Sequence, residues 1–241
     1  NIGWDHMDFL GSSLAAIALE KAGIMKPAVP VVIGSADAEL ANLFKERADA
    51  LGSPITFVGS DEPLPGPVGL GGSHQSQNAR TALAAIRQLR GSGWVIPDIA
   101  IRRGLARVVP NTGILGRWQV LGERPSIVAD VAHNVDGIRV VNAMLETIPH
   151  GRLHIVLGMV NDKDIAAVLS ILPKVATYYF AKADIPRSLD ASLLYEQAAE
   201  HGLVGSTYPT VRSAFEAARS AAAVDDMVLI TGSVFTVAEA I

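Results

Sequence analysis

The stretch Ser126-Ile-Val-Ala-Asp-Val131, continued by Ala132-His-Asn-Val-Asp-Gly137 and Ile138-Arg-Val-Val-Asn-Ala-Met-Leu145, decides the fold class of this chain. Its first part is a short apolar run, which predicts a buried strand. The polar middle predicts a turn, and the last part spaces its apolar residues three and four positions apart, as a helix does. One strand, one loop and one helix over Gly137–Leu145 therefore follow each other within twenty residues.

This unit repeats to the end of the chain. Further strands are expected at Leu153–Met159, Ala176–Ala181, near Thr207 and at Met227–Thr231. The intervening helices are expected at Asp164–Leu172, Ala191–Glu200, Val211–Ala222 and Val234–Ala240. Strands that alternate with amphipathic helices predict an α/β fold with a Rossmann-like, doubly wound parallel sheet.

The first half is less regular. Ser12 and Ser13 are suitable N-caps for a helix to Ala22. Further elements are expected as strands at Val29–Gly34 and Ile55–Val58, helices at Ala36–Ala50 and Gln77–Leu89, and a loop at Gly59–Gly72. Pro110, Gly113 and Gly116 cluster in Val109–Gly116, so we place the domain boundary there and expect domains 1–112 and 113–241.

Composition excludes several classes of protein. Of 241 residues, 49% are hydrophobic and 18% charged, which is typical of a folded chain. The net charge of −4 and the absence of a Lys/Arg run argue against nucleic acid as a partner. No apolar run approaches the ~20 residues of a membrane span, and there is no cysteine. Without a secretory signal, we expect a cytoplasmic monomer.

Lys21 is the first candidate site residue. It continues a stripe of Leu14, Ile17 and Ala18 at helical spacing, so the stripe predicts that its ammonium faces the core. One interpretation is a lysine in the last turn that reaches solvent and is favoured by the helix dipole. The other is an amine whose pKa burial lowers, which takes up CO2 as a carbamate. With His6, that anion would form an N/O site for Mg²⁺ or Mn²⁺.

Two strings near the start carry a family resemblance. Asn1-Ile-Gly-Trp-Asp-His-Met-Asp-Phe-Leu-Gly11 and Glu20-Lys-Ala-Gly-Ile24 together resemble the central-domain signature of folylpolyglutamate and dihydrofolate synthases, which belong to the Mur-ligase superfamily. The resemblance implies that His6 binds a divalent metal and that Lys21 is carbamylated and catalytic. It also implies that residues 1–112 are the C-terminal part of a P-loop-type ATPase domain.

Two further segments resemble nucleotide-binding motifs of that family. His74-Gln-Ser-Gln-Asn-Ala79 opens a helix, and Ser76 or Asn78 would suit a cap; the resemblance implies instead that Asn78 helps to hold adenine. Gly116-Arg117 resembles the entrance to the family's last domain. Arg117 is then either a surface arginine or a contact to ATP phosphates, for which a planar guanidinium is suited.

Asp130–Gly137 places four polar side chains in a loop after a strand, where ligands bind in open α/β sheets. A helix cap needs only one of them. The segment resembles the family's Asp-x-Ala-His-Asn-Pro-x-Gly motif, with Val135 in place of proline. The resemblance implies that Asp130 binds nucleotide, that His133 is catalytic near the phosphates and the incoming glutamate, and, less directly, that Asn134 binds nucleotide.

Two fainter matches follow later strands. Gly158–Asp164 and Thr231–Phe235 resemble family turns, and both are equally explained as helix caps.

The resemblance implies an ATP-dependent ligase that joins L-glutamate to dihydropteroate, tetrahydrofolate or both through an acyl phosphate. No Gly-x-x-x-x-Gly-Lys-Ser/Thr loop occurs in these residues, and the chain opens on Asn1. The family carries its phosphate loop upstream, so we expect this chain alone to turn over ATP feebly or not at all. Two alternatives stay open: a Mur-type ligase acting on a cell-wall precursor, and a non-catalytic nucleotide-binding fragment.

Overall fold

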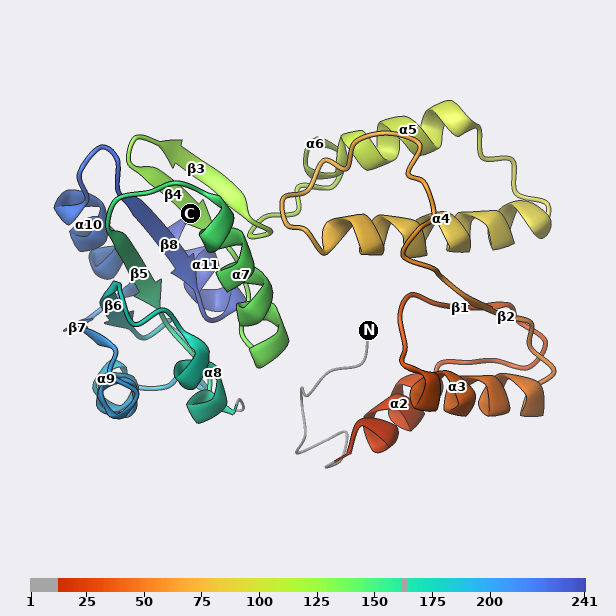
Figure 1. The fold of residues 1–241 in the computed structure, drawn as a ribbon, viewed down its shortest axis with the longest axis horizontal. Coiled ribbons are helices and arrows are strands. Elements are labelled where there is room, and N and C mark those ends of the chain that lie inside the picture. The colour runs from red at the N-terminus through yellow and green to blue at the C-terminus, as the bar shows by residue number, and fades with distance from the viewer. Residues whose placement is uncertain (1–12, 162–163) are drawn as a thin grey trace. The chain divides into compact units, whose positions relative to one another are not determined.

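The computed structural model describes residues 13–161 and 164–241 (Figure 1). The chain divides into two compact units, Asn1–Gly113 and Ile114–Ile241. Each unit is described by itself below. Within the described residues, no helix is both long enough and apolar enough to cross a membrane.

The first unit contains two short parallel strands and several helices. Strands β1 (Val31–Ile33) and β2 (Ile55–Phe57) pair in parallel. The helices are α2 (Leu14–Ala22), α3 (Ala38–Ala50), α4 (Gln75–Gly91), α5 (Asp98–Ala106) and α6 (Val108–Thr112). A small core joins α2 and α3 through the buried residues Ala18, Ala22, Met25, Leu40, Phe44 and Ala48.

The structure adds three details that the sequence did not predict for this unit. Helix α4 begins at Gln75 with His74 as its N-cap, and no side chain caps it, so neither Ser76 nor Asn78 is the cap. Helix α5 was not expected; it buries none of its residues, so it has no core-facing stripe to reveal it. Helix α6 overlaps the segment Val109–Gly116, in which the domain boundary was expected. Pro110 is tolerated there because the first-turn N–H groups of a helix have no intrahelical partner.

The second unit is a six-stranded sheet in the order β3-β4-β8-β5-β6-β7. The strands are β3 (Gln119–Glu123), β4 (Ser126–Ala129), β5 (Leu153–Leu157), β6 (Thr177–Ala181), β7 (Val204–Tyr208) and β8 (Met227–Thr231). The helices are α7 (Val135–Thr147), α8 (Ile165–Ile171), α9 (Ala191–Glu200), α10 (Val211–Ala221) and α11 (Val234–Ala240). Every repeat predicted from the sequence is present, with small shifts at the ends.

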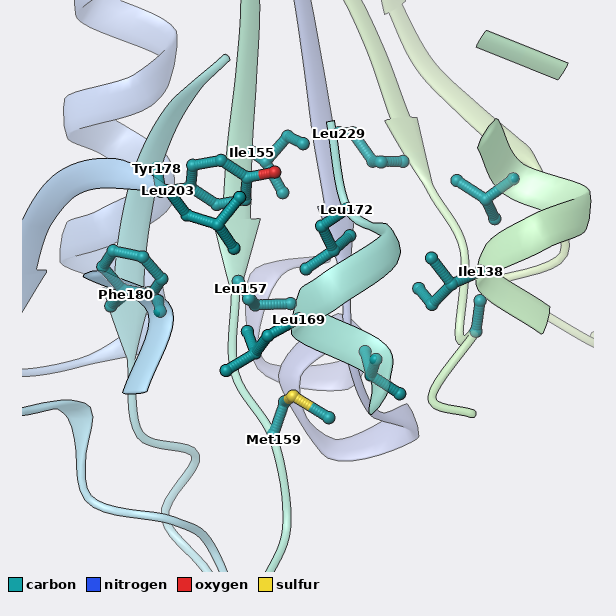
Figure 2. Packing of buried hydrophobic residues seen from close by; sticks show 14 of the residues in the cluster. Ile138, Ile155, Leu157, Met159, Leu169, Leu172, Tyr178, Phe180, Leu203 and Leu229 are labelled. Carbon is teal, nitrogen blue, oxygen red and sulfur yellow. The ribbon is translucent and has the colours of Figure 1, made fainter. Parts of the chain in front are cut away.

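Helices cover both faces of this sheet. Ile155, Leu157 and Leu229 alternate with Val156 and Ile230 along the central strands and enter two different cores. The first core packs against α7, α8 and α9, and the second against α10 and α11. Figure 2 shows part of the first core, with side chains from β5, β6 and β8 gathered around α8.

The expectation of a purely parallel sheet was wrong at one edge. β3 pairs antiparallel with β4, so the sheet is mixed although mostly parallel. β3 was missed because it is a short edge strand whose apolar side chains face outward; Val120 is 60% exposed. Its pattern therefore lacks the buried run by which the central strands were recognised.

Candidate active site

Loops from three neighbouring strands interlock at the carboxyl edge of the second unit's sheet. The Thr231 hydroxyl and the Gly232 N–H both donate to the Ala132 carbonyl, at 3.2 and 2.9 Å. The Gly158 N–H donates to the Thr231 carbonyl at 3.4 Å. The loops after β4, β5 and β8 are thereby tied together, at the edge where open α/β sheets bind ligands.

Two glycines allow this close approach. Gly232 has a φ of +104°, and a Cβ there would lie 2.5 Å from the Gly158 carbonyl oxygen. A Cβ on Gly158 would lie 2.5 Å from the Thr236 hydroxyl, which donates to the Gly158 carbonyl at 2.9 Å. Thr236 is fully buried, and sequence reasoning did not single it out. The signal closest to it was the neighbouring Thr-Gly-Ser string, whose glycine permits the close approach of the two loops.

Asp130 organises the loop that precedes β3. Its carboxylate is buried, with the residue 7% exposed, and accepts the Trp118 N–H at 2.8 Å and the Ala132 N–H at 2.9 Å. Trp118 has a φ of +44°, which is rare for a residue other than glycine. The carbonyl of Gly116, a residue at φ +70°, accepts the Val131 N–H at 3.0 Å. Sequence reasoning missed Trp118, because a backbone donor leaves no trace in composition.

Arg117 lies between Gly116 and Trp118, with its side chain exposed. Both neighbours are anchored to the loop after β4, so the backbone that carries this guanidinium is fixed although the side chain is not. The structure therefore brings Arg117, Asp130 and His133 to one edge of one unit.

His133 and Asn134 follow in the same loop. The half-buried His133 ring donates from Nδ1 to the Val131 carbonyl at 2.9 Å, because a carbonyl can only accept. In the neutral ring the lone pair then lies on Nε2. Asn134 caps α7, where its side-chain oxygen accepts the Gly137 N–H at 2.9 Å. The cap interpretation is thus observed for Asn134.

The fainter motifs also supply caps. Asp164 accepts the Ala167 N–H at 3.1 Å at the start of α8. Ser233 accepts the Thr236 N–H at 3.0 Å at the start of α11. Both side chains satisfy backbone donors that a helix end leaves unpaired.

Two candidate residues of the first unit, Lys21 and Asn78, lie among the described residues. Lys21 is exposed in the last turn of α2, while Ile17, Ala18 and Ala22 form the buried stripe, so the prediction that Lys21 faces the core was wrong. The buried stripe continues at Ala22, four residues after Ala18, and does not include Lys21, three residues after Ala18. Asn78 is exposed, and its side-chain amide donates to the Gln75 side chain at 3.0 Å.

The predicted metal ligand His6 lies outside the described residues. Among residues 13–161 and 164–241, no group of three or more His, Asp or Glu side chains could hold a metal ion. An exposed ammonium is a cation and no ligand, so the described residues alone do not fit a divalent metal.

Comparison with known proteins identifies relatives of this chain, and a family model matches the second unit. Residues 116–234 match the family model described as "Mur ligase, glutamate ligase domain". The dihydrofolate synthase/folylpolyglutamate synthase of Escherichia coli K12 is 34% identical over 99% of this chain and 57% of its own length.

Solved structures agree. The E. coli FolC protein in complex with DHPP and ADP has a TM-score of 0.82 at 31% identity, over 98% of this chain and 58% of its own. A bifunctional folylpolyglutamate synthase/dihydrofolate synthase with Mn, AMPPNP and L-glutamate bound has a TM-score of 0.80 at 30% identity, over the same shares. This chain thus spans less than three fifths of the length of these relatives.

Proposed function

Because this chain belongs to the dihydrofolate synthase/folylpolyglutamate synthase family of Mur-type ligases, we propose that it carries the glutamate-ligating part of a folate ligase. The enzyme would join L-glutamate to dihydropteroate, tetrahydrofolate or both. The observation that carries the proposal is the interlocked sheet edge, which assembles Arg117 and His133 inside the segment that matches the glutamate ligase domain.

The proposed reaction has two steps. A carboxylate oxygen of the pterin substrate takes the γ-phosphoryl group of ATP, which gives an acyl phosphate and ADP. The amine of L-glutamate then attacks the acyl carbon; a C–N bond forms, the bond to the phosphate oxygen breaks, and phosphate leaves. The attacking amine must also lose a proton.

The residues of the second unit have distinct proposed roles. Arg117 would clamp phosphate oxygens through its planar guanidinium. His133 would lie near the phosphate and the glutamate amine, where Nε2 of the neutral ring can accept a proton. Both oxygens of Asp130 accept backbone N–H groups, so we infer that Asp130 serves nucleotide binding by holding the Arg117 loop. Asn134 would contact the nucleotide while its side-chain oxygen continues to cap α7.

Two proposed roles rest on motifs of the first unit. Asn78 would hold adenine, and carbamylated Lys21 would join His6 at Mg²⁺ or Mn²⁺, which would neutralise phosphate charge. The exposed position of Lys21 does not support carbamylation, so this proposed modification rests on the Glu20–Ile24 motif alone. Incubation with ¹³C-labelled bicarbonate tests it: a carbamate carbon resonance that Lys21→Arg abolishes is expected, and its absence from the native chain contradicts the modification.

ADP release is the test of the ligase proposal. We expect release that requires both a pteroate or folate substrate and L-glutamate. For this chain alone we expect little turnover, and for the chain joined to an upstream phosphate-loop segment of a relative we expect it restored. Release that ignores L-glutamate, or persists equally with other amino acids, would refute the proposal.

Two other outcomes would identify the alternatives. Preference for a UDP-muramyl substrate over a pteroate would assign the chain to the cell-wall ligases of the same superfamily. Calorimetric binding of ATP with no turnover, even with the upstream segment present, would identify a non-catalytic nucleotide-binding module.

A further inference from the structure

The first turns of α4 are docked at the carboxyl end of β1. The Gln77 side-chain amide donates to the carbonyl of Gly34, the residue that directly follows β1, at 2.7 Å. The Thr81 hydroxyl lies so close to Gly34 that a Cβ on this glycine would find no room. Ligands of open α/β sheets bind at the carboxyl ends of the strands. The polar side chains at the start of α4 are therefore held at that edge of the first unit's sheet.

Three of these side chains form a hydrogen-bonded chain. The side-chain nitrogen of the exposed Asn78 donates to the side-chain oxygen of Gln75 at 3.0 Å. Gln75 is only 6% exposed, and its own side-chain nitrogen lies 2.9 Å from Nε2 of His74. An amide nitrogen can only donate, so Nε2 is the acceptor, and the neutral ring carries its hydrogen on Nδ1.

The loop before α4 fixes the imidazole in place. Gly72 has a φ of +107°, and a Cβ there would lie 2.7 Å from Cε1 and 3.0 Å from Nδ1 of His74. The Gly72 carbonyl also accepts the Gln75 N–H at 3.0 Å. Nδ1 is buried and has no hydrogen-bond partner within residues 13–161 and 164–241. A buried donor without a partner costs free energy, so stability alone does not explain this tautomer.

The tautomer of His74 determines which atoms Asn78 presents. With the hydrogen on Nε2, Gln75 would have to turn its oxygen toward the ring and its nitrogen toward Asn78. Asn78 would then have to turn its own oxygen inward, because two amide nitrogens cannot bond to each other. In the observed arrangement only one Asn78 N–H is used by Gln75. The Asn78 oxygen and its second N–H remain for a ligand, as an acceptor beside a donor.

We propose that His74 and Gln75 are positioning residues that fix this orientation of the Asn78 amide and thereby select adenine over guanine nucleotides. The inference rests on the proposed function, in which Asn78 holds adenine, and adds to it the basis of base selection. Adenine presents its N6 donor beside its N7 acceptor, and an asparagine amide can pair with both. Guanine presents two acceptors, O6 and N7, at the same edge, so the Asn78 oxygen would face an acceptor.

Nuclear magnetic resonance of the whole 241-residue chain tests the inference. In mildly alkaline buffer, the ¹⁵N signals of His74 are expected to show a hydrogen on Nδ1 and none on Nε2. ATP is expected to shift the Asn78 side-chain amide signals saturably, and GTP to bind about tenfold more weakly. A hydrogen on Nε2 overturns the inference, as does an equal response to ATP and GTP or no response to ATP.

Two substitutions of Gln75 separate positioning from packing. Gln75→Met keeps a similar volume but removes both side-chain hydrogen bonds, so the preference for ATP over GTP should fall about tenfold. Gln75→Glu keeps an oxygen that accepts the Asn78 N–H, so it should retain most of the preference. An unchanged preference in Gln75→Met overturns the inference. Equal loss in both variants also overturns it, because the acceptor for Asn78 would then not matter.

Gln88→Met is the matched control. Gln88 is a half-buried glutamine of the same helix, and its side-chain amide donates to the Thr56 hydroxyl at 3.2 Å. Its loss should leave the ATP preference unchanged, and a loss of preference equal to that of Gln75→Met would contradict the inference.

The ADP-release assay on the chain joined to the upstream segment separates this inference from the ligase proposal. Turnover that requires folate and L-glutamate but uses ATP and GTP equally overturns this inference alone. A preference for ATP that depends on Gln75, without any such turnover, overturns the ligase proposal alone.

Discussion

At the scale of single residues, Asp130 is the most informative polar group of the site. Its two oxygens accept N–H groups from two different loops, and the bond to Trp118 stabilises a residue at positive φ. A buried acceptor that serves two donors costs free energy when it is lost, because the donors are left without partners. The same residue was expected to contact nucleotide directly.

Asp130→Asn should lower the free energy of unfolding of the second unit by about 1–3 kcal/mol. An amide has only one acceptor oxygen, so one of the two backbone N–H groups would face its NH2 group. Urea unfolding and amide exchange at Trp118 and Ala132 measure the effect. Asp136→Asn, on the exposed side of α7, is the control and should change stability by less than about 0.5 kcal/mol. Equal losses in the two variants would contradict this account.

Gly232→Ala should destabilise the second unit more than Gly202→Ala does. Both glycines have positive φ, so each substitution introduces backbone strain of about 1–2 kcal/mol. Only at Gly232 does the added Cβ also meet a carbonyl oxygen, that of Gly158, while the space around Gly202 is open. Thermal unfolding of the two variants measures the difference in their stability. Equal unfolding midpoints would show that the loops after β5 and β8 can move apart to accommodate the added Cβ at little cost in free energy.

At the scale of elements, Asp226 joins the start of β8 to the start of β5. Its carboxylate accepts the Ala223 N–H and the Arg152 N–H, both at 2.8 Å. These two backbone bonds, helped by His154 and the Arg152 charge, lower the pKa of Asp226 to about 2. The cluster lies at the edge of the sheet opposite to the candidate site.

The lowered pKa of Asp226 predicts an acid-sensitive contribution to stability. A carboxyl whose folded pKa is depressed contributes fully above its unfolded pKa of about 3.9 and loses the contribution as pH falls through about 2. Asp226→Asn should therefore be less stable than the native chain at neutral pH and should lose less stability across that window. Asp225→Asn, at the exposed neighbouring position, should keep the native pH profile. Parallel profiles for the native chain and Asp226→Asn would contradict the assignment.

At the scale of the whole molecule, each hydrophobic core belongs to one unit. The cluster around Phe44 draws on α2 and α3, and the two clusters of the sheet draw on residues after 114. Leu229→Ala should destabilise the second unit by about 2–5 kcal/mol, because it removes a fully buried side chain from a close-packed layer (Figure 2). Hydrogen exchange should show faster opening of β5 and β8, with protection of α2 and α3 retained. Equal loss of protection in both units would show that they unfold together.

Sequence alone determined the repeating strands and helices of the second unit and the loops that carry its polar residues. Periodicity records which side chains are buried, so Met227–Thr231 and Ala191–Glu200 were predicted to the residue. The motif strings likewise indicated the family to which the comparisons assign the chain. The edge strand β3 and the exposed helix α5 left no such pattern, since burial does not constrain their side chains.

Only the tertiary structure decided what individual polar groups contact. Whether Lys21 faces the core depends on which side of α2 packs on α3. Helical spacing from Ala18 allowed the buried stripe to continue at either Lys21 or Ala22, so the spacing did not settle this. Asp130 turned out to hold backbone donors twelve and two residues away, and Arg187 to stack on Phe235 across the sheet edge. Such contacts join segments distant in the chain, and local periodicity carries no information about partners brought together by the order of the strands.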